Sequence, residues 1–262
     1  MTTMPTLFVS HGAPTFALEP GLAGAQLLAV GQALGRPKAI VVVSPHWMTD
    51  AVEISSGPTP QTIHDFFGFP RELYELQYRA PGDPPLASDI QKTLLRSGIE
   101  ARLNPTRGLD HGAWVPLRYL YPNADVPVLQ VSFPFHANEK FSLDFGRALS
   151  PLAEMGVLII GSGSLTHNLY EFCVGQPDEM AADYARDFVL WIREAIQMGD
   201  VERLLRAMTM APYARRAHPT LEHFLPLLVA VGAVSNTSPV TVLDGGFRHG
   251  MLSMESYLIG HH

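Results

Sequence analysis

Short apolar runs rich in β-branched residues recur along the chain, with longer segments of helical periodicity between them. The runs predict strands at residues 6–10, 39–44, 126–133, 156–161 and 239–243. The periodic segments predict helices at about 21–34, 84–98, 139–154 and 178–197. Nearly continuous hydrophobicity is typical of strands covered on both faces. We therefore expect an α/β sandwich with a mostly parallel central sheet flanked by helices.

The last helical segment carries one apolar stripe. Tyr184, Phe188, Trp191 and Ala195 recur there at helical spacing, which favours core packing over a cofactor-binding face. We find no internal repeat, low-complexity segment or linker, and 262 residues are compatible with one large domain. Residues 1–262 are therefore expected to form a single domain.

Residues 57–85 form a Pro- and Gly-rich stretch that fits neither a strand nor a helix. The stretch also holds several aromatic residues, namely Phe66, Phe67, Phe69, Tyr74 and Tyr78. This aromatic content argues against a disordered tether. A loop of this length in a compact domain is usually functional. We expect it to act as a lid over a binding site.

The composition agrees with a soluble enzyme and excludes several other classes of protein. A net charge of -7 argues against a nucleic-acid partner, which would need a basic face. No apolar run approaches the roughly 18 residues of a membrane span, and no signal peptide is visible. Cys173 is the single cysteine, which excludes an internal disulfide and a thiolate metal cluster. We expect a cytoplasmic location and predict no particular oligomeric state.

Five of the eleven histidines occur where a strand or helix begins or ends: His11, His46, His111, His167 and His223. The loops beyond the carboxyl ends of strands form the ligand site of α/β folds, and imidazole is the commonest protein ligand for transition metals. A lone histidine after a strand is more often a solvated loop residue. His11 and His46, however, each follow a separate apolar strand and a serine. The pattern favours one metal site at the carboxyl ends of the strands.

The other histidines and one glycine-rich run have weaker interpretations. Residues 161–164 read Gly-Ser-Gly-Ser, but the third glycine of a dinucleotide-binding loop is missing and Thr166 stands in its place. His218 and His223 flank a predicted helix start at Pro219, and only one of them needs to face the site. His64, His136 and His249 receive no role, and the terminal His261 and His262 are left out of the site.

Six ordered motifs carry a specific resemblance. They are Ser-His-Gly-Ala-Pro at 10–14, Val-Val-Val-Ser-Pro-His-Trp at 41–47, Thr-Ile-His-Asp-Phe-Phe-Gly-Phe-Pro at 62–70, Gly-Leu-Asp-His-Gly-Ala-Trp at 108–114, Gly-Ser-Gly-Ser-Leu-Thr-His-Asn at 161–168 and Pro-Thr-Leu-Glu-His-Phe-Leu-Pro-Leu at 219–227. The chain resembles the DOPA-dioxygenase type of extradiol ring-cleavage enzyme, within the class III superfamily of the protocatechuate-4,5-dioxygenase catalytic subunit. The resemblance runs from about residue 5 to Gly260.

The resemblance implies that His11, His46 and His223 are metal ligands and that His167 is a fourth histidine, close to the metal or bound to it. Protocatechuate-type relatives hold Fe(II) with two histidines and a glutamate. Here Glu222 precedes His223, and adjacent side chains diverge by about 100° on a helix, so one of the two points inward. The resemblance favours His223. Fe(II) is the expected working metal, although three neutral imidazoles also suit zinc, which a purified sample can carry.

The implied activity is metal-dependent opening of a catechol ring with O2, on a 3,4-dihydroxyphenyl substrate such as DOPA. His167 is the candidate catalytic base that takes the phenolic proton and later returns it, because imidazole titrates near neutrality. His111, a second catalytic candidate, would orient the substrate or stabilise charge on the reacting oxygen. Trp47, Phe66, Phe67 and Trp114 are expected to bind the aromatic ring. Core packing explains Trp114 equally well.

Two other classes of function use the same residues. A hydrolase would use the three histidines to hold zinc and activate water, without O2. A non-catalytic protein on the same scaffold would be expected to lack a complete acid/base set, whereas His111 and His167 are both present. The dioxygenase with a small catechol and O2 as partners therefore ranks first.

Overall fold

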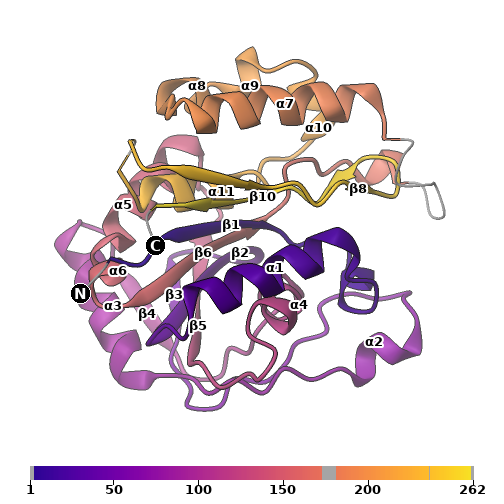
Figure 1. The fold of residues 1–262 in the computed structure, drawn as a ribbon. Coiled ribbons are helices and arrows are strands. Elements are labelled where there is room, and N and C mark those ends of the chain that lie inside the picture. The colour runs from indigo at the N-terminus through magenta and orange to yellow at the C-terminus, as the bar shows by residue number, and fades with distance from the viewer. Residues whose placement is uncertain (1–2, 173–180, 236, 261–262) are drawn as a thin grey trace.

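The computed structural model describes residues 3–172, 181–235 and 237–260, and Figure 1 shows their arrangement. The strands are β1 (Thr6–Ser10), β2 (Ala39–Thr49), β3 (Val52–Ser55), β4 (Ala101–Asn104), β5 (Val128–Pro134), β6 (Val157–Gly163), β7 (Val240–Leu243), β8 (Phe247–Arg248), β9 (Leu252–Ser253) and β10 (Ser256–Ile259). Within the described residues, eight strands form one sheet in the order β4-β3-β5-β2-β6-β1-β10-β7, and β8 pairs with β9.

Helices pack on both faces of this sheet. The α-helices are α1 (Gly21–Leu34), α2 (Arg71–Glu75), α3 (Pro84–Arg96), α4 (His111–Leu120), α5 (Glu139–Leu149), α6 (Pro151–Glu154), α7 (Asp183–Gln197), α8 (Val201–Leu205), α9 (Ala207–Met210), α10 (Ala214–Ala217) and α11 (Leu225–Gly232). In the described part of the chain, the 3-10 helices η1 (Pro14–Ala17) and η2 (Leu169–Glu171) follow β1 and β6.

The central strands β5, β2, β6 and β1 are mutually parallel. At one margin β10 runs antiparallel to β1, and β7 runs antiparallel to β10. Carboxyl ends of parallel strands meet at one edge of a sheet, so the segments after β1, β2 and β6 lie close together. The predicted α/β architecture with a mostly parallel central sheet flanked by helices is confirmed.

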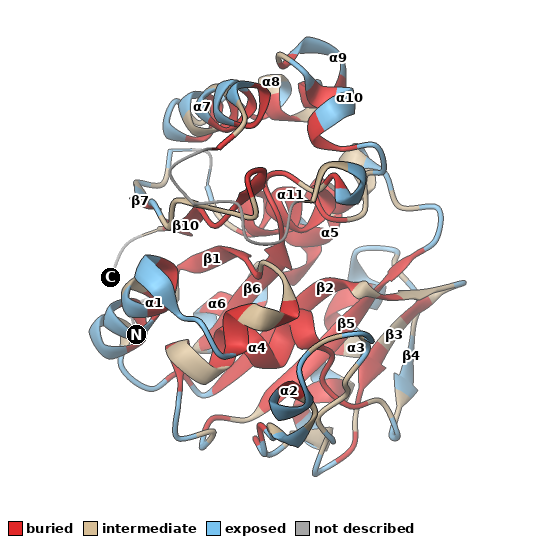
Figure 2. Cartoon of the chain, turned by 90° about the vertical axis from the view of Figure 1, so that its right-hand side faces the viewer, coloured by how far each residue is buried: buried red, intermediate tan, exposed pale blue. Residues whose placement is uncertain are grey.

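Alternation along each strand divides the core between the two faces, and the buried residues form the centre of the molecule in Figure 2. Leu7 and Val9 of β1 pack in the cluster that includes α1 and α4, whereas Phe8 packs with α7 and α11. A third cluster joins alternate residues of β2 and β5 to α3, α5 and α11. The strands are therefore covered on both faces, as their continuous hydrophobicity predicts.

Several predicted boundaries were wrong. β2 continues to Thr49, so His46 and Trp47 lie within the strand rather than in a loop after it. The segment 139–154 is split into α5 and α6 at Ser150 and Pro151, since proline has no N–H with which to continue the helical bonding. The sequence pattern did not predict β3, β4 or β10, each of which has only four residues.

The helix α7 begins at Asp183, and residues 178–180 of the predicted helix lie outside the described residues. Within α7, Tyr184, Phe188 and Ala195 are buried, and Trp191 packs against the same core cluster. Core packing is thus confirmed as the role of this stripe. No helix in the described ranges is long and apolar enough to cross a membrane.

The stretch 57–85 is mostly irregular, contains the short helix α2 and ends in the first two residues of α3. A β-bridge between Thr62 and Leu109 ties it to the segment before α4. Tyr78 is also buried, and its hydroxyl donates a hydrogen bond to the carbonyl of Tyr121. The stretch is therefore a loop packed onto the domain at several points.

The helices α5 and α11 pack backbone against backbone. A Cβ atom at Gly232 would lie 2.1 Å from the carbonyl oxygen of Leu143, and one at Gly146 would lie 2.1 Å from that of Val229. Backbone cannot give way as the end of a flexible side chain can. The two helices therefore approach closely only because both positions are glycine.

We predict that Gly232→Ala destabilises the protein by about 1–3 kcal/mol, the usual cost of overpacking a core. The added methyl group would push α11 away from α5 and from the sheet. Urea denaturation should show a lower midpoint for this variant. Ala25→Ser, which adds one atom at an exposed position of α1, should leave the midpoint nearly unchanged. An unaltered midpoint for Gly232→Ala would contradict the close packing.

Candidate metal centre

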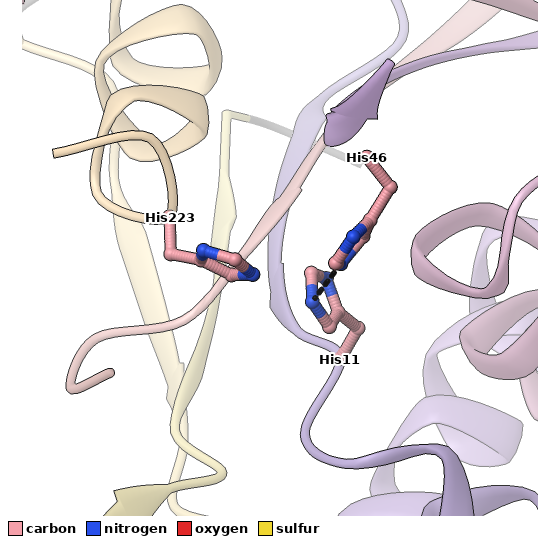
Figure 3. Close-up of side chains that lie close together, drawn as sticks. All are labelled: His11, His46 and His223. Atoms are coloured by element: carbon pink, nitrogen blue, oxygen red, sulfur yellow. Dashed lines mark hydrogen bonds between the residues drawn. The ribbon is translucent and has the colours of Figure 1, made fainter. Parts of the chain in front are cut away.

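Three histidine rings converge at the carboxyl edge of the parallel strands (Figure 3). His11 follows β1, His46 lies in β2, and His223 lies in the turn that precedes α11. The Nε2 atoms of His11 and His46 are 3.1 Å apart. One ring nitrogen from each of the three residues lies within 4.8 Å of the others. This spacing is what three imidazoles need to share one ion.

Hydrogen bonds determine which nitrogen of His11 faces the other rings. Its Nδ1 lies 3.0 Å from the hydroxyl of Ser162. That hydroxyl donates its own proton to the carbonyl of Gly112, so it accepts from His11. Nδ1 of His11 therefore carries the proton, and Nε2 presents a lone pair to the other two histidines.

The other two rings have the same orientation. Nδ1 of His223 lies 3.2 Å from a carboxylate oxygen of Glu222, and Nδ1 of His46 lies 3.6 Å from one of Asp65. A carboxylate behind a ligating histidine keeps the proton on the outer nitrogen and makes the inner one a better donor. Glu222 thus contacts the outer nitrogen of His223 and is not part of the group that His223 forms with His11 and His46.

The glycines of the run 161–164 explain how His223 reaches this position. A Cβ atom at Gly163 would lie 2.3 Å from the carbonyl oxygen of His223, and one at Gly161 would lie 2.0 Å from that of Pro226. The backbone N–H of Ser164 also donates to the His223 carbonyl. The run is therefore the end of β6 and a packing surface for the turn before α11. This finding also corrects the predicted helix start, since α11 begins at Leu225 and not near Pro219.

His46 depends on an irregular end of β2. The pairing of β2 with β5 shifts between Val43 and Met48, and its pairing with β6 ends at Val43. Pro45, which cannot donate to a sheet, lies in this irregular stretch. The strand thereby extends beyond its neighbour β6 and carries His46 over the end of the sheet.

A buried polar network supports the segment between His46 and His111. The Asp110 carboxylate accepts hydrogen bonds from Ser44, Arg107 and Gln130. Arg107 also donates to the carbonyl oxygen of His46. Burial raises the pKa of Asp110, while Arg107 and Gln130 act in the opposite direction. The network therefore holds in place the backbone that carries His46 and His111.

Burial keeps the histidine rings neutral. It is the largest cause that lowers the pKa of His11 and His223 well below the usual value, and neighbouring histidines add to the effect. Burial, followed by the charge of His111, lowers the pKa of His46 to about 3. Burial raises the pKa of Asp65, but the hydrogen bond and charges of His111 and His46 outweigh it and lower the value to about 2. At neutral pH the site therefore combines neutral imidazoles with an ionised carboxylate.

His167 and His111 flank the three converging rings. The His167 ring stacks on His223 with centroids 3.5 Å apart, and its possible ligand atoms group with those of Glu222 and His223 rather than with His11 and His46. His111 is the first residue of α4, and both its backbone N–H and its Nδ1 contact Asp65. Burial lowers the pKa of His167, while Glu222 acts in the opposite direction.

The five histidines line a cavity of about 360 Å³, which falls within the range of small-molecule sites. Its other lining residues are Gly12, Ala13, Pro14, Phe66, Phe69, Leu169, Phe172 and Leu252. Phe66 and Phe69 come from the loop 57–85, and Leu169 and Phe172 come from the segment after β6. The loop therefore forms one wall of the cavity, as expected for a lid.

Of the four aromatic residues predicted to bind substrate, only Phe66 lines the cavity. Phe67, its neighbour in the loop, is 91% exposed and does not line the cavity. Trp47 is buried, with the Arg107 guanidinium 4.9 Å from its ring centre, because it alternates with His46 along β2. Trp114 is fully buried and donates to the carbonyl of Ile63, which supports the core-packing interpretation.

Sequence reasoning did not identify Asp65, Ser162 or Phe69 as part of the site. Asp65 stands in the motif His-Asp-Phe-Phe, one residue from His64, and this adjacency of a carboxylate to the lid aromatics was its only signal. His64 itself does not line the cavity, and its Nε2 contacts the carbonyl of Leu76. Only the three-dimensional contact with His111 reveals the role of Asp65.

A larger hollow of about 690 Å³ lies near both ends of the described chain, lined by Met4, Arg147, Glu154 and Gly260 among others. No histidine or cysteine is among its described lining residues. Size alone would favour this hollow, but the convergence of metal-binding side chains favours the smaller cavity as the functional site.

Comparison with known proteins agrees with this site. Residues 9–258 match the family described as the catalytic LigB subunit of aromatic ring-opening dioxygenase. The chain belongs to this family. It is similar to the 4,5-DOPA dioxygenase extradiol of Beta vulgaris, with 40% identity over 96% of this chain and 95% of the relative. It is also similar to the protein of that name in Escherichia coli K12, with 36% identity over 99% of this chain and 96% of the relative.

A solved structure has the same fold as this chain. The crystal structure of an uncharacterized protein from Escherichia coli K12 superposes with a TM-score of 0.82 and 31% identity, and the match covers 98% of this chain and all of that one. The family member described here is therefore an extradiol ring-cleavage dioxygenase, and the prediction of that activity from the sequence is confirmed. This family implies a metal cofactor.

The residues of the site fit such a cofactor. His11, His46 and His223 present neutral nitrogen donors, and imidazole suits iron as well as zinc. These three histidines differ from the ligand arrangement of two histidines and one carboxylate. Glu222 contacts the outer nitrogen of His223 instead of joining the three converging rings. The metal's charge would therefore be balanced by carboxylates behind the rings rather than by a direct bond to one.

We predict that His46→Ala abolishes metal retention, because two imidazoles remain where three converge. His64→Ala should retain the metal, since His64 is not part of the cavity lining. Metal content after desalting, measured by atomic emission, distinguishes the two variants, and circular dichroism checks that both are folded. A folded His46→Ala protein with stoichiometric metal would remove His46 from the ligand set.

Proposed function

We propose that the protein opens the ring of a 3,4-dihydroxyphenyl substrate with O2, that DOPA is one such substrate, and that Fe(II) is the working metal. His11, His46 and His223 would hold the ion. The supporting observation is the convergence of three neutral imidazole nitrogens at one end of a cavity whose lining, apart from its five histidines, is apolar. Zinc, which the same donors suit, would be the metal found when iron has been lost during purification.

Fe(II), when bound, supplies the redox chemistry that allows O2 to react with the aromatic ring and orients the two catechol oxygens. The protein supplies the acid/base chemistry. A phenolic oxygen binds a metal well only after its proton has been removed. His167 lines the cavity beside His223, and burial keeps its ring neutral and able to accept that proton. We assign it the role of general base.

Glu222 stabilises the proton on His167. Its carboxylate lies in the same cluster of potential ligand atoms as His167 and raises the pKa of that ring against the effect of burial. The protonated imidazole can then act as the acid that returns the proton to the product. His111, held by Asp65 through two hydrogen bonds, would orient the substrate from the opposite side of the cavity.

Two further properties complete the proposal. The partners are the small aromatic substrate and O2, both of which enter the cavity between the loop 57–85 and the segment after β6. We propose the cytoplasm as the location, because a chain with a single cysteine has no internal disulfide that would need an oxidising compartment.

The Fe(II)-reconstituted protein should consume one O2 for each catechol and form a yellow ring-opened semialdehyde. A monophenol of the same shape should not be turned over, because it cannot offer two oxygens to the metal. The zinc-loaded protein should bind the catechol without consuming O2, since zinc has no redox chemistry. An oxygen electrode and the visible spectrum measure both outcomes. Hydrolytic activity with zinc, together with inactivity toward catechols with Fe(II), would overturn the proposal.

His167→Ala should keep most of its metal and still bind a catechol, because His167 lies outside the group formed by the three converging nitrogens. Turnover should fall about 10²–10⁴-fold, the usual contribution of a positioned acid/base. Metal analysis and steady-state kinetics on the same sample separate the two effects. Complete loss of metal would make His167 a ligand and transfer the role of base to His111.

A further inference from the structure

The end of the cavity away from the converging nitrogens is apolar. Apart from the five histidines, every lining residue is glycine, alanine, proline, leucine or phenylalanine. A catechol that directs its two oxygens to the histidines would place its ring substituent against Phe66, Phe69, Leu169 or Phe172. No hydroxyl, amide or carboxylate among the described lining residues would meet that substituent.

The chain also provides no cation there. Residues 1–2, 173–180, 236 and 261–262, which the structure does not describe, contain no Lys or Arg. All 18 lysine and arginine residues of the sequence therefore lie in the described ranges, and none of them lines the cavity. Arg107, the arginine beside His46, is held by Asp110 and stacked on Trp47.

The charges that are near the cavity have the opposite sign. The carboxylates of Asp65 and Glu222 contact His111 and His223 from behind. They would compensate a divalent metal and stabilise a proton on an imidazole, but they would repel an anionic substituent on the substrate. An anion placed in an apolar wall without a cation also loses its hydration without replacement.

We propose that this cavity selects catechols by the charge next to the ring: it accepts an uncharged substituent and rejects a carboxylate bonded directly to the ring. This specificity rests on the proposed function, since it assumes that the histidines hold the two catechol oxygens through a metal. A longer substituent such as the amino-acid chain of DOPA reaches the mouth, where Leu169 is 66% exposed, and its charges remain in water.

Three 4-substituted catechols of matched shape test the selection: 4-isopropylcatechol, 3,4-dihydroxybenzamide and 3,4-dihydroxybenzoate. The amide is polar and electron-withdrawing, as the carboxylate is, but it carries no charge. A difference between the benzamide and the benzoate therefore reports the effect of charge, apart from polarity and from the electronic effect on the ring. We expect kcat/KM of the Fe(II) protein to be about 10²-fold lower for the benzoate than for the isopropyl compound, the order of discrimination that an apolar pocket achieves. The amide should lie between them.

Binding is measured separately by anaerobic calorimetry on the zinc-loaded full-length protein. The same order of affinities is expected, with or without turnover. If the compounds bind in this order but the Fe(II) protein consumes no O2, the proposed function fails while the selectivity stands. If the benzoate binds or reacts as well as the isopropyl compound, or if no catechol binds at all, the selectivity is overturned.

Two charge variants on the helix η2 locate the effect. Leu169→Arg places a cation on a residue that lines the cavity, whereas Tyr170→Arg places the same charge on the next residue, which is 93% exposed and does not line it. Leu169→Arg should improve kcat/KM for the benzoate relative to the isopropyl compound by about 10-fold, and Tyr170→Arg should leave the ratio unchanged. Equal effects of the two variants would show that the selection does not arise in the cavity.

Discussion

The site depends on the close approach of one turn of the backbone to the strand β6. Gly161 and Gly163 have no side chains on the face where the turn before α11 packs, so the carbonyl oxygens of His223 and Pro226 lie almost against the strand. Ser162, between these glycines, points to the other face and accepts the hydrogen bond from His11. One strand end thereby positions two histidines that are far apart in the sequence. A Cβ atom at either glycine would displace His223 without changing any of the converging imidazole side chains.

The second requirement is that the three converging imidazoles lie close together without becoming charged. Burial and mutual repulsion keep His11, His46 and His223 neutral, so their inner nitrogens are available at neutral pH. The carboxylates of Asp65 and Glu222 do not bond to the centre directly but hold the outer nitrogens. The arrangement places negative charge where it could balance a metal or a transferred proton, while the three converging nitrogens stay neutral.

Much of the fold could be predicted because buried parallel strands leave continuous apolar runs, and β1, β2, β5 and β6 all show them. The short strands β3 and β10 could not be predicted, since four residues of mixed polarity carry little periodicity. The histidines of the site were recognisable from their positions at element ends and from six motifs. The substrate wall was predicted less well, because residue type alone does not say which way a side chain points. Trp47 and Phe67 are each adjacent in sequence to a residue of the cavity, and neither of them lines it. Asp65 acts through a contact with His111, which no local pattern encodes.

The place of β1 in the sheet has a consequence for how the chain folds during synthesis. Thr6 pairs with Ile159 of β6 on one side and with Ile259 of β10 on the other. A ribosome that adds about 5–20 residues per second completes β10 roughly 10–50 s after β1 has been made. Throughout that interval the first apolar strand has an open edge, and His11 has no His223 beside it. Because such long-range pairing is slow to form, the nascent enzyme is exposed to aggregation until its last strand emerges. A chain shortened by even β10 would leave β1 permanently without its partner on that side.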